Sequence, residues 1–107
     1  KMQFSMLTDA VRHEIPKGTT DYVLFGIEAH VCILQTCLSL LHSPTGSRVW
    51  VVQDAVRSQR EEDMQVAVMR MRQAGAIVTT AESAVFEAMR TAEHPRFRAI
   101  SALFKQH

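Results

Sequence analysis

Three short apolar runs alternate along this chain with segments that have the periodicity of helices. The runs cover residues 21–27, 48–53 and 76–79, and they are rich in residues that favour extended structure. Continuous apolar runs of this length are typical of strands that are buried on both faces of a parallel sheet. Because a helix-sized segment separates each pair of runs, the order predicts parallel strands joined by right-handed crossovers. The expected fold class is therefore α/β, with a parallel sheet between two layers of helices.

The segments between the runs carry helical patterns and start signals. Residues 31–42 place apolar side chains at positions i, i+3, i+4 and i+7, which form one face of a helix. Ser58 with Glu61, and Thr79 with Glu82, have the spacing of capping boxes, in which a hydroxyl caps the start of a helix. The expected helices are residues 4–14, 31–42, 59–73 and 82–90, with a last helix after Pro95.

The chain has 107 residues, which suits a single domain over residues 1–107. Three strands are too few for a sheet that is covered on both faces and protected at both edges. The chain also begins at Lys1 rather than at a methionine. We therefore expect further strands of the same domain upstream of Lys1.

Charge and composition exclude several classes of partner. The formal net charge is +1, and the densest basic cluster is interleaved with acidic residues, so we expect neither nucleic-acid nor anionic-membrane binding. No apolar run reaches the roughly 20 residues that a membrane span requires. The chain has two cysteines and no zinc-like spacing, so we expect a reducing compartment and no metal or cofactor within it. We expect an intracellular location, with the cytoplasm as the first choice. A targeting segment upstream would instead direct the protein to an organelle.

The candidate for chemistry is Cys32, which lies where the first apolar run meets the helix of residues 31–42. In open α/β sheets, ligands bind beyond the carboxyl ends of the strands. The unpaired N–H groups of a first helical turn there favour a thiolate and can hold a developing oxyanion. The alternative is a cysteine that only packs in the core, which is how we interpret Cys37 because it lies on the apolar face.

Two further residues admit two interpretations each. His30 is either a base for Cys32 or a cap or pocket-wall residue, and a separation of two residues is poor geometry for a side-chain pair. Asp54 follows the second apolar run, so it is either a catalytic acid or a brace for the next loop. The residues alone favour the structural interpretation for both.

Four motifs together resemble a known family. These are KMQFSM at residues 1–6, GIEAHVC at 26–32, VVQDA at 51–55 and EHPRFRAISALFK at 93–105. The chain resembles the isochorismatase-like cysteine hydrolases, and within them the branch called isochorismatase domain-containing proteins. The resemblance implies a three-layer, Rossmann-like fold with a six-stranded parallel sheet. This chain would supply the C-terminal half to two-thirds of that domain.

The resemblance also implies a set of site residues. Cys32 matches the family's nucleophile and Lys1 matches its catalytic lysine, which acidifies the thiol. The family's catalytic aspartate belongs to the first strand, which we expect upstream. A cis peptide bond would join Ile27 to Glu28, and the N–H groups of Glu28 and Cys32 would form the oxyanion hole. Asp54 matches an acidic residue that braces the pocket.

The implied reaction is hydrolysis of a small amide or related acyl compound through a covalent thioester on Cys32. Members of the family commonly form homo-oligomers, so we expect one here, with a small molecule as the substrate. The alternative is a non-catalytic family member that serves as an oligomeric scaffold or binding protein. Some relatives carry a ribonuclease label, which the near-zero net charge does not favour for this chain.

Overall fold

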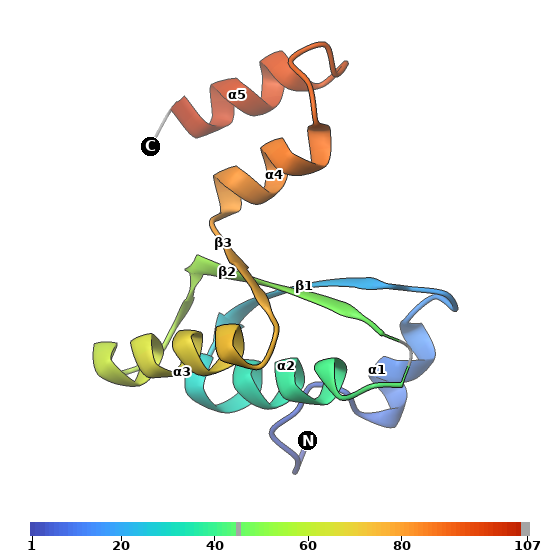
Figure 1. Cartoon of the computed structure of the whole chain (residues 1–107), viewed down its shortest axis with the longest axis vertical. Coiled ribbons are helices and arrows are strands. Elements are labelled where there is room, and N and C mark those ends of the chain that lie inside the picture. Colours follow the sequence, from blue (N-terminus) through green and yellow to red (C-terminus); the bar gives the residue numbers. More distant parts are fainter. Residues whose placement is uncertain (45, 106–107) are drawn as a thin grey trace.

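The computed structural model describes residues 1–44 and 46–105. Its elements alternate between helices and parallel strands along the chain (Figure 1). In chain order they are α1 (Asp9–Glu14), β1 (Asp21–Ile27), η1 (Ala29–Ile33), α2 (Leu34–Leu41), β2 (Arg48–Arg57), α3 (Glu61–Gln73), β3 (Ile77–Thr79), α4 (Ala81–Met89) and α5 (Phe97–Lys105). The described strands form one parallel sheet in the order β1-β2-β3. The predicted α/β class and the parallel sheet are confirmed.

Strand β2 is longer than the sequence predicts. We expected it to end at Gln53, but it continues to Arg57. Its pairing with β1 is irregular, because Leu24 lies opposite Val51 whereas Gly26 lies opposite Val56. The additional residues of β2 form a bulge, after which the side chain of Val56 returns to the core. The sequence did not predict this continuation, because the residues of the bulge interrupt the apolar run from which the strand was predicted.

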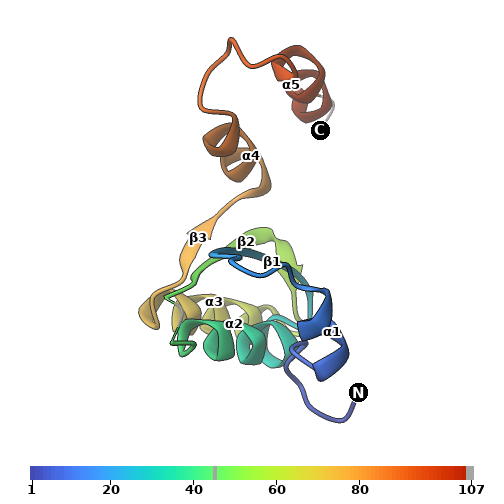
Figure 2. The ribbon, with the colours of Figure 1, turned by 90° about the vertical axis from the view of Figure 1, so that its right-hand side faces the viewer.

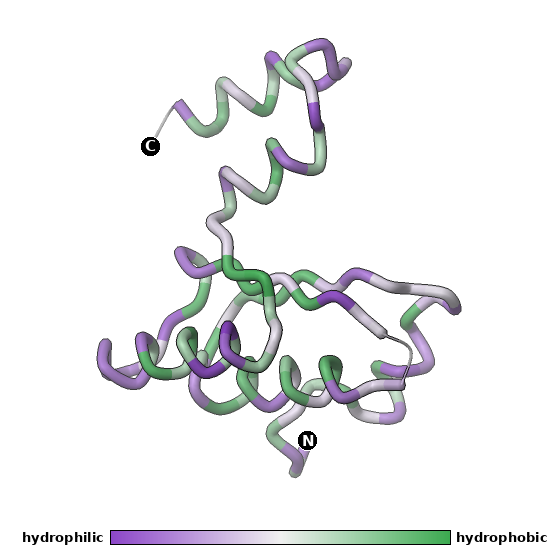
Figure 3. Tube along the Cα trace, in the orientation of Figure 1, coloured by the Kyte–Doolittle hydropathy of each residue, from purple (hydrophilic) through white to green (hydrophobic). Residues whose placement is uncertain are grey.

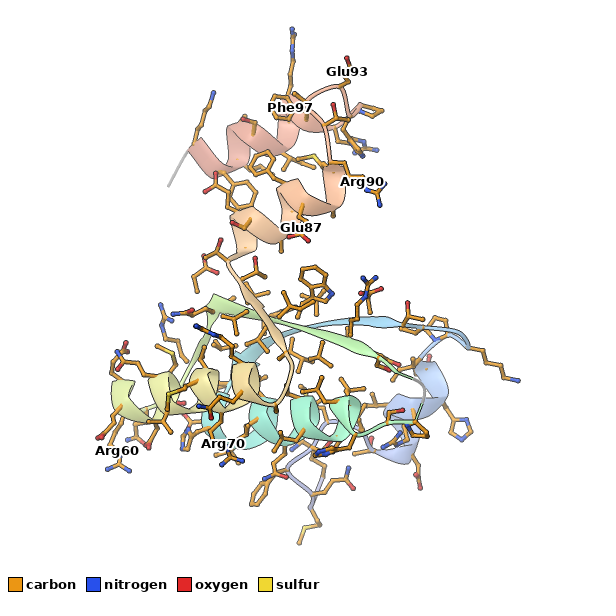
Figure 4. All side chains as sticks on the ribbon, viewed as in Figure 1. Arg60, Arg70, Glu87, Arg90, Glu93 and Phe97 are labelled. Carbon is orange, nitrogen blue, oxygen red and sulfur yellow. The ribbon has the colours of Figure 1, made fainter. Side chains whose placement is uncertain are left out.

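The core lies between the sheet and the helices α2 and α3, which cover one face (Figures 1 and 2). Apolar residues concentrate where these helices meet the strands (Figure 3). Arg60, which precedes α3, and Arg70 on α3 are exposed and extend away from the sheet (Figure 4). The fully buried large side chains are Ile33, Met71, Val49, Val51, Val56, Thr36 and Cys37. Burial of this kind contributes roughly 25 cal/mol per Å² of apolar surface.

The other face of the sheet is largely open. Val23, Phe25 and Ile27 of β1 are 55%, 65% and 71% exposed, and they alternate with the buried Leu24. Helices α4 and α5 lie on this side of the sheet (Figure 2). The rings of Phe86 on α4 and Phe97 on α5 are 6.1 Å apart.

A cleft of about 450 Å³ separates this outer face from α4. Val23 and Trp50 line the cleft from the sheet, and Ala84 and Ala88 line it from α4. Helix α4 therefore stands off from the strands that it faces.

Several predicted helix boundaries were wrong. Residues 4–8 are not helical, and α1 begins only at Asp9. The helix expected over residues 31–42 begins instead at Leu34, because the residues from Ala29 to Ile33 form a π-helical turn. Helix α4 is capped by Thr80, one residue later than predicted, through its hydroxyl and the Ser83 N–H.

The proposed capping box at Ser58 is also absent. The N-cap of α3 is Arg60, whose side chain makes no capping hydrogen bond. The Ser58 hydroxyl instead contacts the ring of His30. A tertiary contact has therefore replaced the local one.

Candidate active site

The turn between β1 and α2 holds Cys32 at the carboxyl end of β1. We call residues 27–32 the nucleophile loop, after the nucleophile that the family resemblance predicts at Cys32. The peptide bond between Ile27 and Glu28 is cis, at the position that the resemblance implies. The Glu28 carbonyl accepts hydrogen bonds from the N–H groups of Val31 and Ile33, both at 3.2 Å. Cys32 is half-buried, so its thiol remains accessible from this end of the sheet.

Lys1 lies beside Cys32 although 31 positions separate them. The Lys1 Nζ is 3.5 Å from the Cys32 Sγ. It also donates to the carbonyls of Gln3 and Phe4, at 3.0 and 2.9 Å. These two carbonyls hold the ammonium group in place. A cation at this distance stabilises negative charge on the sulfur.

Thr36 connects the N-terminal segment to the nucleophile loop. This residue is 2% exposed, and it is a polar residue buried in the core. The hydroxyl donates to the Cys32 carbonyl at 2.7 Å and accepts from the Met6 N–H at 2.8 Å. The sequence alone does not indicate this role, because nothing in the helical pattern distinguishes a bridging threonine from a packed one.

The side chains of Glu28 and His30 face the connection between β2 and α3. The Glu28 Oε1 accepts from the Gln59 N–H at 3.1 Å, and the His30 Nδ1 lies 2.7 Å from the Ser58 Oγ. The His30 Nε2 is 3.8 Å from the Glu28 Oε2 and 4.0 Å from the Asp63 Oδ2. Ser58 was missed as a site residue because its spacing to Glu61 suggested a helix cap.

Asp54 and Cys37 lie apart from these contacts. The Asp54 Oδ1 accepts from the Ala81 N–H at 2.9 Å, so this carboxylate holds the first turn of α4. This contact corresponds to the structural interpretation of Asp54, in which its carboxylate braces a following segment. Cys37 is fully buried, and burial raises the pKa of its thiol to about 11.

The described residues contain neither a metal-binding cluster nor a membrane-spanning helix. Across residues 1–44 and 46–105, no group of three or more His, Cys, Asp or Glu side chains is arranged to hold a metal ion. Within the same ranges, the helices are too short or too polar to cross a bilayer.

The sequence and the fold of this chain match those of known proteins. The model of the isochorismatase domain family matches residues 1–83. The chain belongs to the isochorismatase domain family. Its parallel sheet and flanking helices are those of an isochorismatase-like fold.

Relatives in this family resemble the whole chain. The secreted isochorismatase effector Isc1 of Phytophthora sojae is 44% identical, over 100% of this chain and 51% of that protein. Isochorismatase domain-containing protein 1 of Danio rerio is 40% identical, over 98% of this chain and 37% of that protein. The chain therefore spans about half the length, or less, of these isochorismatase-family relatives.

Solved structures agree with the family assignment. The structure of MAR1 ribonuclease from Caenorhabditis elegans has a TM-score of 0.87 and 40% identity, over 96% of this chain and 52% of that one. The pyrazinamidase/nicotinamidase of Streptococcus mutans UA159 has a TM-score of 0.61 and 26% identity, over 73% of this chain and 44% of that one. The structural neighbours of this chain therefore include proteins named as a ribonuclease and as an amidase, which supports a hydrolase family.

Proposed function

We propose that this chain carries the nucleophile of a cysteine hydrolase, which acts on a small amide or related acyl compound through a thioester with Cys32. The observation that carries the proposal is the 3.5 Å approach of the Lys1 Nζ to the Cys32 Sγ at the carboxyl end of β1. Parallel sheets bind ligands at that end. Membership of the isochorismatase family supports hydrolytic chemistry.

The proposed reaction has two stages. The Cys32 thiolate attacks the carbonyl carbon, and a tetrahedral oxyanion forms that the N–H groups of Glu28 and Cys32 stabilise. The intermediate collapses when the C–N bond breaks, and the amine leaves with a proton. Water then hydrolyses the thioester, releasing the acid and restoring the thiol. The positive charge of Lys1 faces the sulfur before the attack, and the family resemblance assigns the proton transfers to the family's aspartate.

Alkylation by iodoacetamide tests the activated thiol. Labelled residues are located by mass spectrometry across a pH series, and Lys1→Gln is compared with Lys17→Gln, an exposed lysine between α1 and β1. We expect Cys32 to react faster than N-acetylcysteine near neutral pH. Lys1→Gln should slow that reaction several-fold, and Lys17→Gln should leave it unchanged.

The converse result favours a non-catalytic scaffold or binding protein. Slow labelling of Cys32 that Lys1→Gln does not alter would contradict the nucleophile assignment. The Caenorhabditis elegans neighbour is named a ribonuclease, but a net charge of +1 offers little attraction for RNA phosphates. Homo-oligomerisation and an intracellular location remain predictions, and one relative is named as secreted.

A further inference from the structure

Two adjacent contacts join the nucleophile loop to the connection between β2 and α3. Glu28 accepts a hydrogen bond from the Gln59 N–H, and His30 contacts the Ser58 hydroxyl at 2.7 Å. On the loop, the contacting groups are the side chains of Glu28 and His30. Their partners, Gln59 and Ser58, are adjacent in the sequence. We call these four residues the loop clamp.

The loop clamp is attached to rigid parts of the fold. Residues 58 and 59 follow directly after β2, whose Arg57 lies opposite Ile27 of β1. They precede α3, which buries Met64 and Met71 in the core. The clamp therefore ties a turn without regular strand pairing to two elements that are fixed by packing.

The environment of the His30 ring defines its role. Two carboxylate oxygens, from Glu28 and Asp63, lie within 3.8 and 4.0 Å of Nε2. A lone pair directed at two carboxylates is unfavourable, so we assign the hydrogen to Nε2. In that tautomer the Nδ1 accepts the hydrogen bond of the Ser58 hydroxyl.

This arrangement separates His30 from the chemistry at sulfur. Both ring nitrogens face groups of the clamp and of α3, and the contact of the Cys32 Sγ is with Lys1. His30 is therefore not placed as the base for Cys32, which was one of its two interpretations from sequence. Along the chain it lies two residues before Cys32.

We propose that His30 and Ser58, supported by Glu28 and Gln59, are positioning residues that hold the nucleophile loop so that the Cys32 sulfur stays beside Lys1. This inference rests on the proposed function, because it assigns a purpose to the placement of the nucleophile. It adds two positioning residues that act through Cys32 without touching the substrate.

Substitution of Ser58 tests the clamp with the alkylation assay. Ser58→Ala removes the hydroxyl, Ser58→Thr retains it, and Ser39→Ala removes an exposed hydroxyl from α2 as the matched control. We expect Ser58→Ala to slow Cys32 alkylation near neutral pH by about fivefold to thirtyfold, the scale of one lost hydrogen bond to a charged or polar partner. Its pH profile should move to higher pH, and Ser58→Thr should restore both quantities.

The buried Cys37 separates positioning from loss of structure. A variant that is merely less folded exposes both thiols, so Cys32 and Cys37 would both label faster. A clamp variant should label more slowly at Cys32, with Cys37 still protected. Faster labelling of both thiols, or an unchanged Cys32 rate in Ser58→Ala, would overturn the proposal.

Amide hydrogen exchange keeps the test independent of thiol chemistry. Exchange over residues 27–33 is measured by mass spectrometry in the protein, in Ser58→Ala and in Ser39→Ala. We expect faster exchange in this segment for Ser58→Ala alone, even if Cys32 itself proves unreactive in the protein. An activated Cys32 with unchanged exchange would reject the clamp and leave the proposed function standing, whereas an unreactive Cys32 with faster exchange would do the reverse.

Discussion

Replacing Thr36 by valine tests whether the buried hydroxyl holds the Lys1 segment against the nucleophile loop. Valine has nearly the same shape, so the substitution removes two hydrogen bonds and little volume. The Met6 N–H and the Cys32 carbonyl lose their partner at 2.8 and 2.7 Å. Leaving a buried polar group unpaired costs roughly 1–3 kcal/mol, and both of these groups are only partly buried, so the lower half of that range applies.

The additional methyl group offsets part of this loss, by about 0.8 kcal/mol. The net destabilisation should therefore be about 2 kcal/mol, measured as the change in the free energy of unfolding in urea. Thr36→Ser is the matched control, because it keeps the hydroxyl and loses only a methyl group, at a cost of about 1 kcal/mol.

A second measurement tests the link to the site. If Thr36 holds the two segments together, Thr36→Val should also slow Cys32 alkylation, whereas Thr36→Ser should not. A Thr36→Val protein as stable as the parent, with the same Cys32 rate, would refute this reasoning. A stability loss without a change in rate would make Thr36 a packing residue only.

Three further predictions concern other parts of the sheet and the core. Hydrogen bonds from Arg48 and then from Trp50 lower the pKa of Asp21, so this carboxylate stabilises the fold above its unfolded pKa near 3.8. That contribution is lost as the pH falls through the lower folded value, and Asp21→Asn should remove this acid dependence from thermal melts at pH 3 and pH 5. Gly26→Ala places a side chain at φ 116°, and denaturant titration should show a loss of about 1–2 kcal/mol. The Cys37 thiol, with a pKa of about 11, should stay unlabelled by iodoacetamide at pH 9 until urea unfolds the protein.

The sequence predicted those elements whose apolar side chains repeat regularly. The run at residues 21–27 coincides with β1, and Gly75 follows α3 with φ 113°, as a glycine after a helix end should. The bulge in β2 was not predictable, because it depends on which residue of β1 lies opposite. Similarly, residues 4–8 have helical composition, but the Gln3 side chain donates to the Ser5 and Leu7 carbonyls and organises a turn instead.

The same distinction between local patterns and tertiary contacts applies to the site residues. The placement of Cys32 after a strand follows from local pattern, whereas its neighbour Lys1 came only from the family resemblance. Neither Ser58 nor Thr36 carried a signal for a role at the site, since each is a common residue whose partner lies 28 or 30 positions away. Local spacing predicts capping and periodicity, and it carries no information on which loops meet in three dimensions.

Trp50 gives this chain a built-in optical probe. It is the only tryptophan in the sequence, it lines the cleft between the outer sheet face and α4, and its indole N–H donates to Asp21 at 3.0 Å. Indole emission moves to shorter wavelength when water leaves its surroundings. Any polypeptide or ligand that covers this face will therefore change the intrinsic fluorescence, and the event can be followed without a label.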